Sequence, residues 1–139
     1  MTFDEMKGIL EEYIDTKKYL KAQERRIAEL RAKIDGLSAV DYSHEKVIAS
    51  ASNSHVEGII LRLIELEEDL SKTMAKMFAE EDMIAERMKE CTQLEQAMLI
   101  DRYMNQWSWK RICKHYHYSY NSRGAVKAVN KAVKKMSKD

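Results

Sequence analysis

The sequence contains no proline and only four glycines among its 139 residues. Since these two residues break helices and form turns, their scarcity argues against a fold of many short elements. Two cysteines are too few for a disulfide-stabilised scaffold, so we expect a reduced, cytoplasmic protein with free thiols at Cys91 and Cys113. No apolar run approaches membrane-spanning length, and the first residues, MTFDEMKGILEEYI, lack the features of a secretory signal. We therefore expect no membrane partner.

The residues that are abundant favour helices. Ala, Leu, Ile, Met, Glu, Lys and Arg dominate, as they do in long helices, so the sequence predicts an all-α fold. Near the N-terminus, apolar residues recur mainly at steps of three and four, which indicates one long amphipathic helix. They are Met6, Leu10, Tyr13, Leu20, Ile27 and Ile34. We expect this helix to stop at Gly36, and residues 37–53, rich in Ser, Ala and Asn, to form a loop.

A second long helix is predicted downstream, because apolar residues recur there every seven positions. They are Val56, Leu63, Leu70, Met77 and Ile84, and the stripe is widened by Ile59, Ile60, Leu66, Met74 and Met88. Glu67 and Glu81 interrupt this seam, which therefore differs from a strict leucine zipper. Residues 1–90 are predicted to form an antiparallel, coiled-coil-like helical hairpin for oligomerisation or partner binding, with a homodimer favoured. A monomeric three-helix core is the alternative.

Charge is distributed very unevenly along the chain. The segment from Arg102 to Asp139 carries ten Lys or Arg and one Asp, a formal +9, whereas the rest holds 14 basic and 22 acidic residues, a formal −8. The overall value of +1 therefore conceals two parts of opposite sign. Such asymmetry points to a polyanion-binding segment joined to another part; the alternative is a solvated basic helix without a partner.

Residues 91–139 are predicted to contain three short helices. Thr92, with Glu95 three positions later, has the spacing of a capping box, and Ser108 is a candidate N-cap for the next helix. That helix presents one apolar face, assigned to the core, of Trp109, Ile112, Cys113 and Tyr116. The last helix has an inner face of small and apolar residues: Ala125, Ala128, Val129, Ala132, Val133 and Met136.

The opposite face of the last helix presents long cations and an amide without any glutamate to pair with them, which is unusual for a plain surface helix. Duplex DNA is the expected partner, because a major groove admits one helix, Arg can bond guanine, Asn can bond adenine, and Lys suits phosphates. The candidate base contacts are Tyr120, Asn121, Ser122, Arg123, Lys127 and Asn130. The candidate phosphate contacts are Ser108, Lys110, Lys114, Lys131, Lys134 and Lys135.

These residues resemble a known family. The run RYMNQWSWKRIC, the YSY after it and the alanine pattern that follows are similar to the helix-turn-helix of sigma-factor region 4, in the version found in phage transcriptional regulators of the ArpU and RinA type. Arg102 and Tyr103 match the pair that closes the preceding helix in that family, and Ser108 and Trp109 match the residues that open the motif. The resemblance covers roughly residues 94–136. It implies a phage or prophage transcriptional regulator, with RNA polymerase as a possible further partner.

Two departures from the family pattern concern the turn. His117 stands where the family has glycine, so we expect a different backbone geometry there, since histidine is less comfortable at positive φ. Two additional residues also separate Ser119 from the first inner-face alanine. The recognition helix is therefore expected to begin at Ser119 or at Ser122, and in both cases Arg123 lies near its N-terminus.

The sequence gives less support to other functions. Cys113, His115 and His117 are of metal-ligand types, but on one helix His115 points away from the other two, so no metal and no cofactor is expected. The common nucleotide-binding and catalytic motifs are absent, which predicts a non-enzyme. Two alternatives to a regulator stay open. One is an interaction protein whose basic tail docks on an acidic protein, and the other is an adaptor like the small subunit of a phage packaging enzyme, which forms larger rings.

Overall fold

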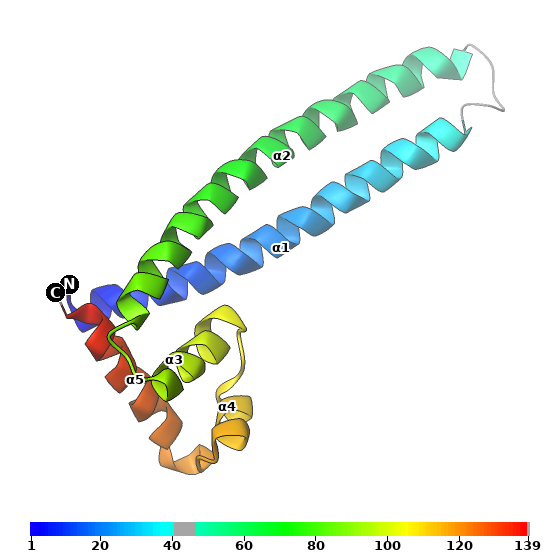
Figure 1. The fold of residues 1–139 in the computed structure, drawn as a ribbon. Helices are drawn as coiled ribbons and strands as arrows, with labels where there is room; N and C mark the ends of the chain where they lie inside the picture. The colour runs from blue at the N-terminus through cyan, green and yellow to red at the C-terminus, as the bar shows by residue number, and fades with distance from the viewer. Residues whose placement is uncertain (41–46, 139) are drawn as a thin grey trace. The chain divides into compact units, whose positions relative to one another are not determined.

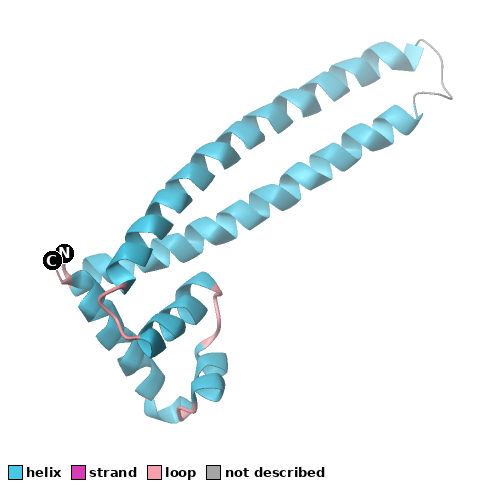
Figure 2. Ribbon diagram, viewed as in Figure 1, coloured by secondary structure: helices cyan, strands magenta, loops and turns pink. Residues whose placement is uncertain are grey.

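The computed structural model describes residues 1–40 and 47–138, and within these ranges the fold is all-α, as predicted. Two long helices, α1 (Phe3–Val40) and α2 (Val47–Met88), are followed by α3 (Gln93–Leu99), α4 (Trp109–Tyr116) and α5 (Gly124–Ser137). A π-helical turn, η1 (Ile100–Met104), extends α3, and a 3-10 turn, η2 (Tyr120–Ser122), precedes α5. Figure 2 shows that short loops join α2 to α3 and connect the helices after it. Among the described helices, none carries an apolar stretch that could cross a membrane.

Both long helices extend further than the sequence suggested. The predicted stop at Gly36 is wrong, because α1 continues to Val40; one glycine inside a 38-residue helix costs only about 1 kcal/mol. The predicted loop over residues 37–53 is too long, since α2 already begins at Val47. Alanine is the best helix former and serine is tolerated in helices, so this composition did not exclude helix. The remainder of the predicted loop, residues 41–46, lies outside the described residues.

The contacts divide the chain into two compact units, and each contains parts of both long helices. Unit 1 comprises Met1–Lys17 and Met77–Asp139, and unit 2 comprises Lys18–Lys76. This division differs from the predicted boundary between residues 90 and 91, because the first turns of α1 and the last turns of α2 share a core with the C-terminal helices. The separate roles expected for the hairpin and the C-terminal helices stay predictions.

In unit 2, the two long helices lie side by side and antiparallel (Figure 1). Their apolar stripes face inward, with buried side chains at Leu20, Ile27, Leu30 and Ile59. The seam also holds polar contacts: Arg31 pairs with Glu67, and the Tyr19 hydroxyl donates to Asp69 at 2.6 Å. The glutamate that interrupts the apolar repeat of α2 therefore contacts α1 directly.

The apolar stripe of α2 is only partly covered in unit 2. Ile60, Leu61 and Ile64 are 40%, 62% and 47% exposed, so this helix presents apolar surface to its surroundings. Ile60 belongs to the residues that widen the apolar stripe of this helix, and the first helix leaves it exposed. The neighbouring Ile59 takes the buried position instead.

In unit 1, one core joins the start of α1 and the end of α2 to the three C-terminal helices. Its largest fully buried members are Tyr13, Met6, Leu10, Ile84, Met98, Leu99, Ile112, Met136, Val129 and Val133. Lys17 fills the gap in the apolar stripe of α1, because its ammonium donates to the carbonyl oxygen of Met104 at 2.6 Å. The hydroxyl of Tyr13 donates to Glu81, and burial, reinforced by this bond, raises the pKa of Tyr13.

Candidate nucleic-acid interface

Helix α4 begins where the sequence predicts. The hydroxyl of Ser108 accepts a hydrogen bond at 3.2 Å from the backbone N–H three positions later, which caps the helix. Ile112 and Cys113 face inward and are buried, while Trp109 and Tyr116 are partly buried and pack against the same core. The core face predicted for this helix is confirmed.

Helix α4 ends at His117, which adopts the left-handed conformation with φ 62° and ψ 41°. The expectation of a different backbone geometry is therefore wrong, since the histidine takes the conformation that suits glycine. The N–H of His117 bonds to the carbonyl of Cys113, and the N–H of Tyr118 donates to the same carbonyl at 2.8 Å. These bonds satisfy a carbonyl at the helix end and offset a cost of about 1 kcal/mol for a side chain at positive φ.

The connection to α5 consists of the 3-10 turn η2 and Arg123, which is also left-handed, with φ 55° and ψ 17°. Helix α5 therefore begins at Gly124, after both of the predicted starts. The serine hydroxyls compete with helical hydrogen bonds here, because Ser122 donates to the carbonyl of Ser119 at 2.9 Å. Glycine suits the next position, since a Cβ at Gly124 would lie 3.1 Å from a ring carbon of Tyr118, which is a tight contact.

Helix α5 packs its predicted inner face against α3 and α4 (Figure 1). Five members of that face are at most 1% exposed: Ala125, Val129, Ala132, Val133 and Met136. Ala128 is partly buried and packs against the same core. The inner face is confirmed, and its small residues let the helix axes approach closely. The other side of α5 consequently faces away from the core.

Most of the predicted contact residues lie on this outward side or on the neighbouring surface of α4. The exposed ones are Tyr120, Asn121, Ser122, Arg123, Lys127, Lys131 and Lys134, and Ser108, Lys110 and Lys114 at α4, whereas Asn130 is partly buried. Arg123 is the residue immediately before the first turn of α5, so it lies at the N-terminus of that helix, as the sequence predicted.

Several base-contact candidates are brought together at the N-terminus of α5. Tyr120, Asn121 and Arg123 line one surface hollow. Its remaining lining comes from α4 and the first turn of α5: Trp109, Cys113, Ala125 and Val126. The hollow therefore combines apolar side chains with an amide, a phenol and a guanidinium. Apolar side chains can contact thymine methyls, and an amide or a guanidinium can bond to base edges.

The cations on this surface have no acidic partner within the described part of the chain. No carboxylate there forms an ion pair with Lys110, Lys114, Arg123, Lys127 or Lys131. Long basic side chains that are left unpaired repel each other, and a polyanion relieves that repulsion.

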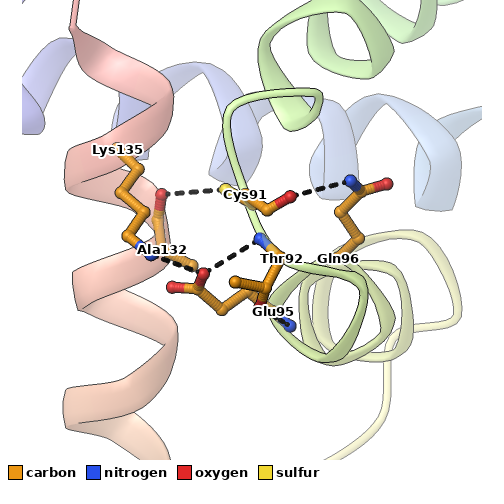
Figure 3. A network of polar contacts seen from close by, with 6 residues as sticks. All are labelled: Cys91, Thr92, Glu95, Gln96, Ala132 and Lys135. Carbon is orange, nitrogen blue, oxygen red and sulfur yellow. Dashed lines mark hydrogen bonds and ion pairs between the residues drawn. The ribbon is translucent and has the colours of Figure 1, made fainter.

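Lys135, a predicted phosphate contact, has a different environment (Figure 3). Its ammonium lies 2.7 Å from an oxygen of Glu95, and both side chains are largely covered, with 31% and 15% exposed. The same carboxylate oxygen accepts a hydrogen bond from the N–H of Thr92 at 3.0 Å, as the predicted capping box requires. Lys135 thus ties α5 to the start of α3 and is not a free cation.

The charge on Glu95 is stabilised by these contacts. The hydrogen bond from Lys135 and the bonds from Thr92 hold the pKa of the Glu95 carboxyl below its usual range, although partial burial opposes them. Close by, the thiol of Cys91 donates to the carbonyl of Ala132 at 3.4 Å, and burial raises the pKa of that thiol. The C-terminal half of α5 is therefore fastened by polar contacts as well as by its apolar face.

Two further contacts hold the end of α5. The ammonium of Lys134 lies 5.9 Å from the centre of the Phe3 ring, although its side chain is exposed. A guanidinium N–H of Arg87 donates to the carbonyl oxygen of Met136 at 3.0 Å. Cationic residues of the last turns of α5 therefore contact other parts of unit 1.

A second group of basic and aromatic residues lies on α4 and just before it, and two of its members, Trp107 and Arg111, were not among the predicted contact residues. The Arg111 guanidinium carbon lies 4.0 Å from the centre of the Trp107 ring. His115, which the sequence placed on the surface, meets the Trp107 ring edge-on at 5.2 Å between ring centres. The sequence did contain an indication of this group, because Trp107, Arg111 and His115 are four positions apart, the spacing that brings side chains to one side of a helix.

Asp101 supports this side of α4 from η1. One of its oxygens accepts from Asn105 at 2.9 Å and the other accepts from the hydroxyl of Tyr116. Burial raises the pKa of Tyr116 to about 12, with the bond to Asp101 as the second cause. Both oxygens of this carboxylate are therefore engaged in holding the fold.

In the described ranges, no three His, Cys, Asp or Glu side chains come together as metal ligands would. Cys113 is buried, whereas His115 and His117 are exposed. Comparisons with protein-family models, curated proteins and solved structures find no match for this chain.

Proposed function

We propose that this chain binds duplex DNA in a sequence-specific manner, with α4 and α5 acting as a helix-turn-helix and α5 as its recognition helix. The single observation that carries the proposal is the outward side of α5, where Arg123, Lys127 and Lys131 are exposed and no described carboxylate pairs with them. The opposite side is fully buried, so the cations are held facing outward.

The chemistry of this side suits a major groove. Arg123 lies at the N-terminus of α5, where recognition helices approach base edges, and its guanidinium can bond both acceptors of guanine. Asn121 lines the same hollow, and an amide there can bond adenine. Lys127 and Lys131 follow one and two turns later, and Lys110 and Lys114 add phosphate contacts from α4.

The biological role is proposed from the resemblance to phage regulators of the ArpU and RinA type. The chain would then regulate transcription of phage or prophage genes and have no enzymatic activity, with RNA polymerase as a possible second partner. A cytoplasmic location in the bacterial host belongs to the same proposal.

Self-association is the second part of the proposal, with a homodimer favoured. Ile60, Leu61 and Ile64 form an exposed apolar group on α2, and a second copy of the chain can cover it. A dimer would present two recognition helices to an inverted repeat. Light scattering measures the mass of the oligomer. A ring of more than two copies would instead favour the packaging-adaptor alternative.

The experiment that tests the proposal is selection from a random duplex library with the full chain, followed by sequencing. A defined motif is the expected result. Gel retention on random duplex at low and moderate salt serves as the companion measurement, because non-specific binding depends steeply on salt. Retention of no duplex at either salt concentration would reject DNA binding and favour an acidic protein as the partner of the basic surface.

A further inference from the structure

The structure contains a second basic surface that the proposed recognition helix does not use. We call it the α4 cluster, and it consists of Trp107, Arg111, Lys114, His115 and His117. Lys114 is the one member already proposed above as a phosphate contact. These residues together line an open surface hollow. Four of the five side chains carry N–H donors on basic groups, and the fifth is an indole.

The α4 cluster is separate from the hollow at the N-terminus of α5. Trp109 and Cys113 of α4 line that first hollow, and the α4 cluster shares no residue with it. Successive residues of a helix are rotated by about 100°, so Arg111 and His115 point to a different side of α4 from Trp109 and Cys113. Helix α4 thus has a basic hollow on each of two sides.

Three side chains of the α4 cluster, Trp107, Arg111 and His115, pack against one another. The guanidinium of Arg111 stacks on Trp107 at 4.0 Å, and His115 packs edge-on against both Trp107 and Tyr116, at 5.2 Å and 4.9 Å between ring centres. A stacked guanidinium loses less conformational freedom on binding than a free one and keeps its N–H groups available.

The cluster also lacks a neutralising group of its own. No acidic residue lines the hollow. Asp101 is the acidic residue that contacts Tyr116 next to it, and both of its oxygens already accept hydrogen bonds, from Asn105 and Tyr116. Arg111 and Lys114 form no ion pair within the described ranges. The hollow therefore offers two fixed positive charges to an anion.

Base stacking is a weaker explanation for the aromatic ring. Trp107 is only partly exposed, Arg111 covers one face of its ring, and His115 packs against it with the two ring planes at 81°. A platform for single-stranded bases needs an open ring face. The guanidinium above the ring instead presents a planar fork of donors, the geometry that binds phosphate oxygens.

We infer that the α4 cluster binds a backbone phosphate of the same DNA duplex, outside the groove that α5 enters. This inference rests on the proposed function. It adds a contact on a second side of α4, so the footprint of the protein extends further along the duplex than the recognition helix alone would reach. Such a contact carries no sequence information, since every nucleotide presents the same phosphate.

The test compares Arg111→Gln with a matched control, Arg25→Gln, in which an exposed arginine of unit 2 is changed in the same way. Affinity is measured over a range of salt concentrations for the selected duplex, a scrambled duplex and a single strand. Arg111→Gln should weaken binding to both duplexes equally, by roughly fivefold to tenfold, and lower the salt slope by about one unit. Arg111→Lys should restore most of the slope, because it keeps the charge.

Phosphate-ethylation interference locates the contact. The unmodified protein should show interference at one phosphate that becomes insensitive in Arg111→Gln, while Arg123→Ala keeps that interference. Urea unfolding checks that Arg111→Gln is folded. Because Arg111 is exposed, the urea midpoint of the variant should equal that of the unmodified protein within error. If that midpoint falls, His115→Gln replaces it in the same assay, because it changes another exposed member of the cluster that is not among the phosphate contacts already proposed.

The outcomes separate this inference from the function it rests on. If the unmodified protein binds neither duplex, the proposed function fails and the inference fails with it. If the unmodified protein and Arg123→Ala behave as proposed while Arg111→Gln matches Arg25→Gln, only the inference is wrong. A loss confined to the single strand would also overturn it, in favour of base stacking at Trp107.

Discussion

Helix α5 carries basic side chains along its whole length, but its two halves lie in different surroundings. In the N-terminal part, taken here as Gly124–Lys131, Lys127 and Lys131 are exposed and have no carboxylate partner in the described part of the chain. In the C-terminal half, Lys135 is bonded to Glu95 and Lys134 lies near the ring of Phe3. Lysines at similar helical spacing therefore have different surroundings, because residues of unit 1 reach the basic side chains of only one half of the helix.

The first turns of α1 pack in the same core as the C-terminal half of α5. A substitution in that part of α1 should therefore have the largest effect on the free energy of unfolding. Leu10 is fully buried in the same core as Met136, so Leu10→Ala should lower the free energy of unfolding by about 2–5 kcal/mol. Leu94→Ala, at a leucine that is 59% exposed, should change it by less than about 0.5 kcal/mol. Urea unfolding of the two variants measures the difference. Equal losses would show that α1 does not contribute to this core.

The next effect concerns the N-terminus of α5. Arg123→Ala should cost about 1–3 kcal/mol of binding free energy on the selected duplex and relax specificity at one base pair, because a bidentate contact to guanine is lost. Titration of the selected duplex and of single-base variants measures both quantities. Losses of the same size on selected and random duplex would count against direct readout by this residue.

A matched pair of lysines sharpens the contrast between the two halves. Lys135→Ala should lower the free energy of unfolding by about 1 kcal/mol, since it removes a partly buried hydrogen-bonded pair. Lys131→Ala should leave stability unchanged and instead weaken all duplexes and reduce the salt slope by about one unit. Urea unfolding and salt-dependent titration are run on both variants. The comparison fails if the two substitutions have the same profile.

The bond between Lys135 and Glu95 also predicts a pH dependence. Because the pKa of Glu95 is lower in the folded chain than its ordinary value of 4.5, its contribution to stability is complete above pH 4.5 and is lost as the pH falls through the folded pKa. The urea midpoint of the unmodified protein should therefore fall more between pH 6 and pH 3 than that of Glu95→Gln. Parallel pH profiles for the two proteins would contradict this prediction.

The smallest expected effect on stability comes from His117, the residue that ends α4. His117→Gly should raise the free energy of unfolding by roughly 0.5–1 kcal/mol, since glycine adopts the left-handed conformation without the penalty of a side chain. His117→Ala is the matched control and should not stabilise the chain, because alanine keeps the Cβ. Thermal or urea unfolding gives both values.

Features encoded within a few residues could be predicted from the sequence. The caps at Thr92 and Ser108 are such features, and so is the buried face of α5, since its period of three and four is that of a helix. The predicted loop, residues 37–53, was longer than the structure allows, because serine and alanine occur in both loops and helices. The start of α5 was missed because the left-handed conformation of Arg123 depends on the turn around it.

Features that depend on distant residues could not be predicted. The pairing of Lys135 with Glu95 joins positions 40 residues apart. From the sequence alone, this lysine was therefore predicted to be a phosphate contact. The grouping of Met1–Lys17 with the C-terminal helices is likewise a tertiary property, although the apolar stripe of α1 was visible. In the α4 cluster, the spacing of Trp107 and Arg111 was visible, but only the structure shows that they stack.

The central claim is that the N-terminal half of α5 contacts DNA while the C-terminal half belongs to the fold. Backbone amide chemical shifts, measured by NMR as the selected duplex is added to the full chain, test it most directly. The largest changes are expected from Tyr120 to Lys131, and only small ones from Ala132 to Ser137. Changes concentrated at Lys134 and Lys135, or confined to residues 18–76, would contradict it.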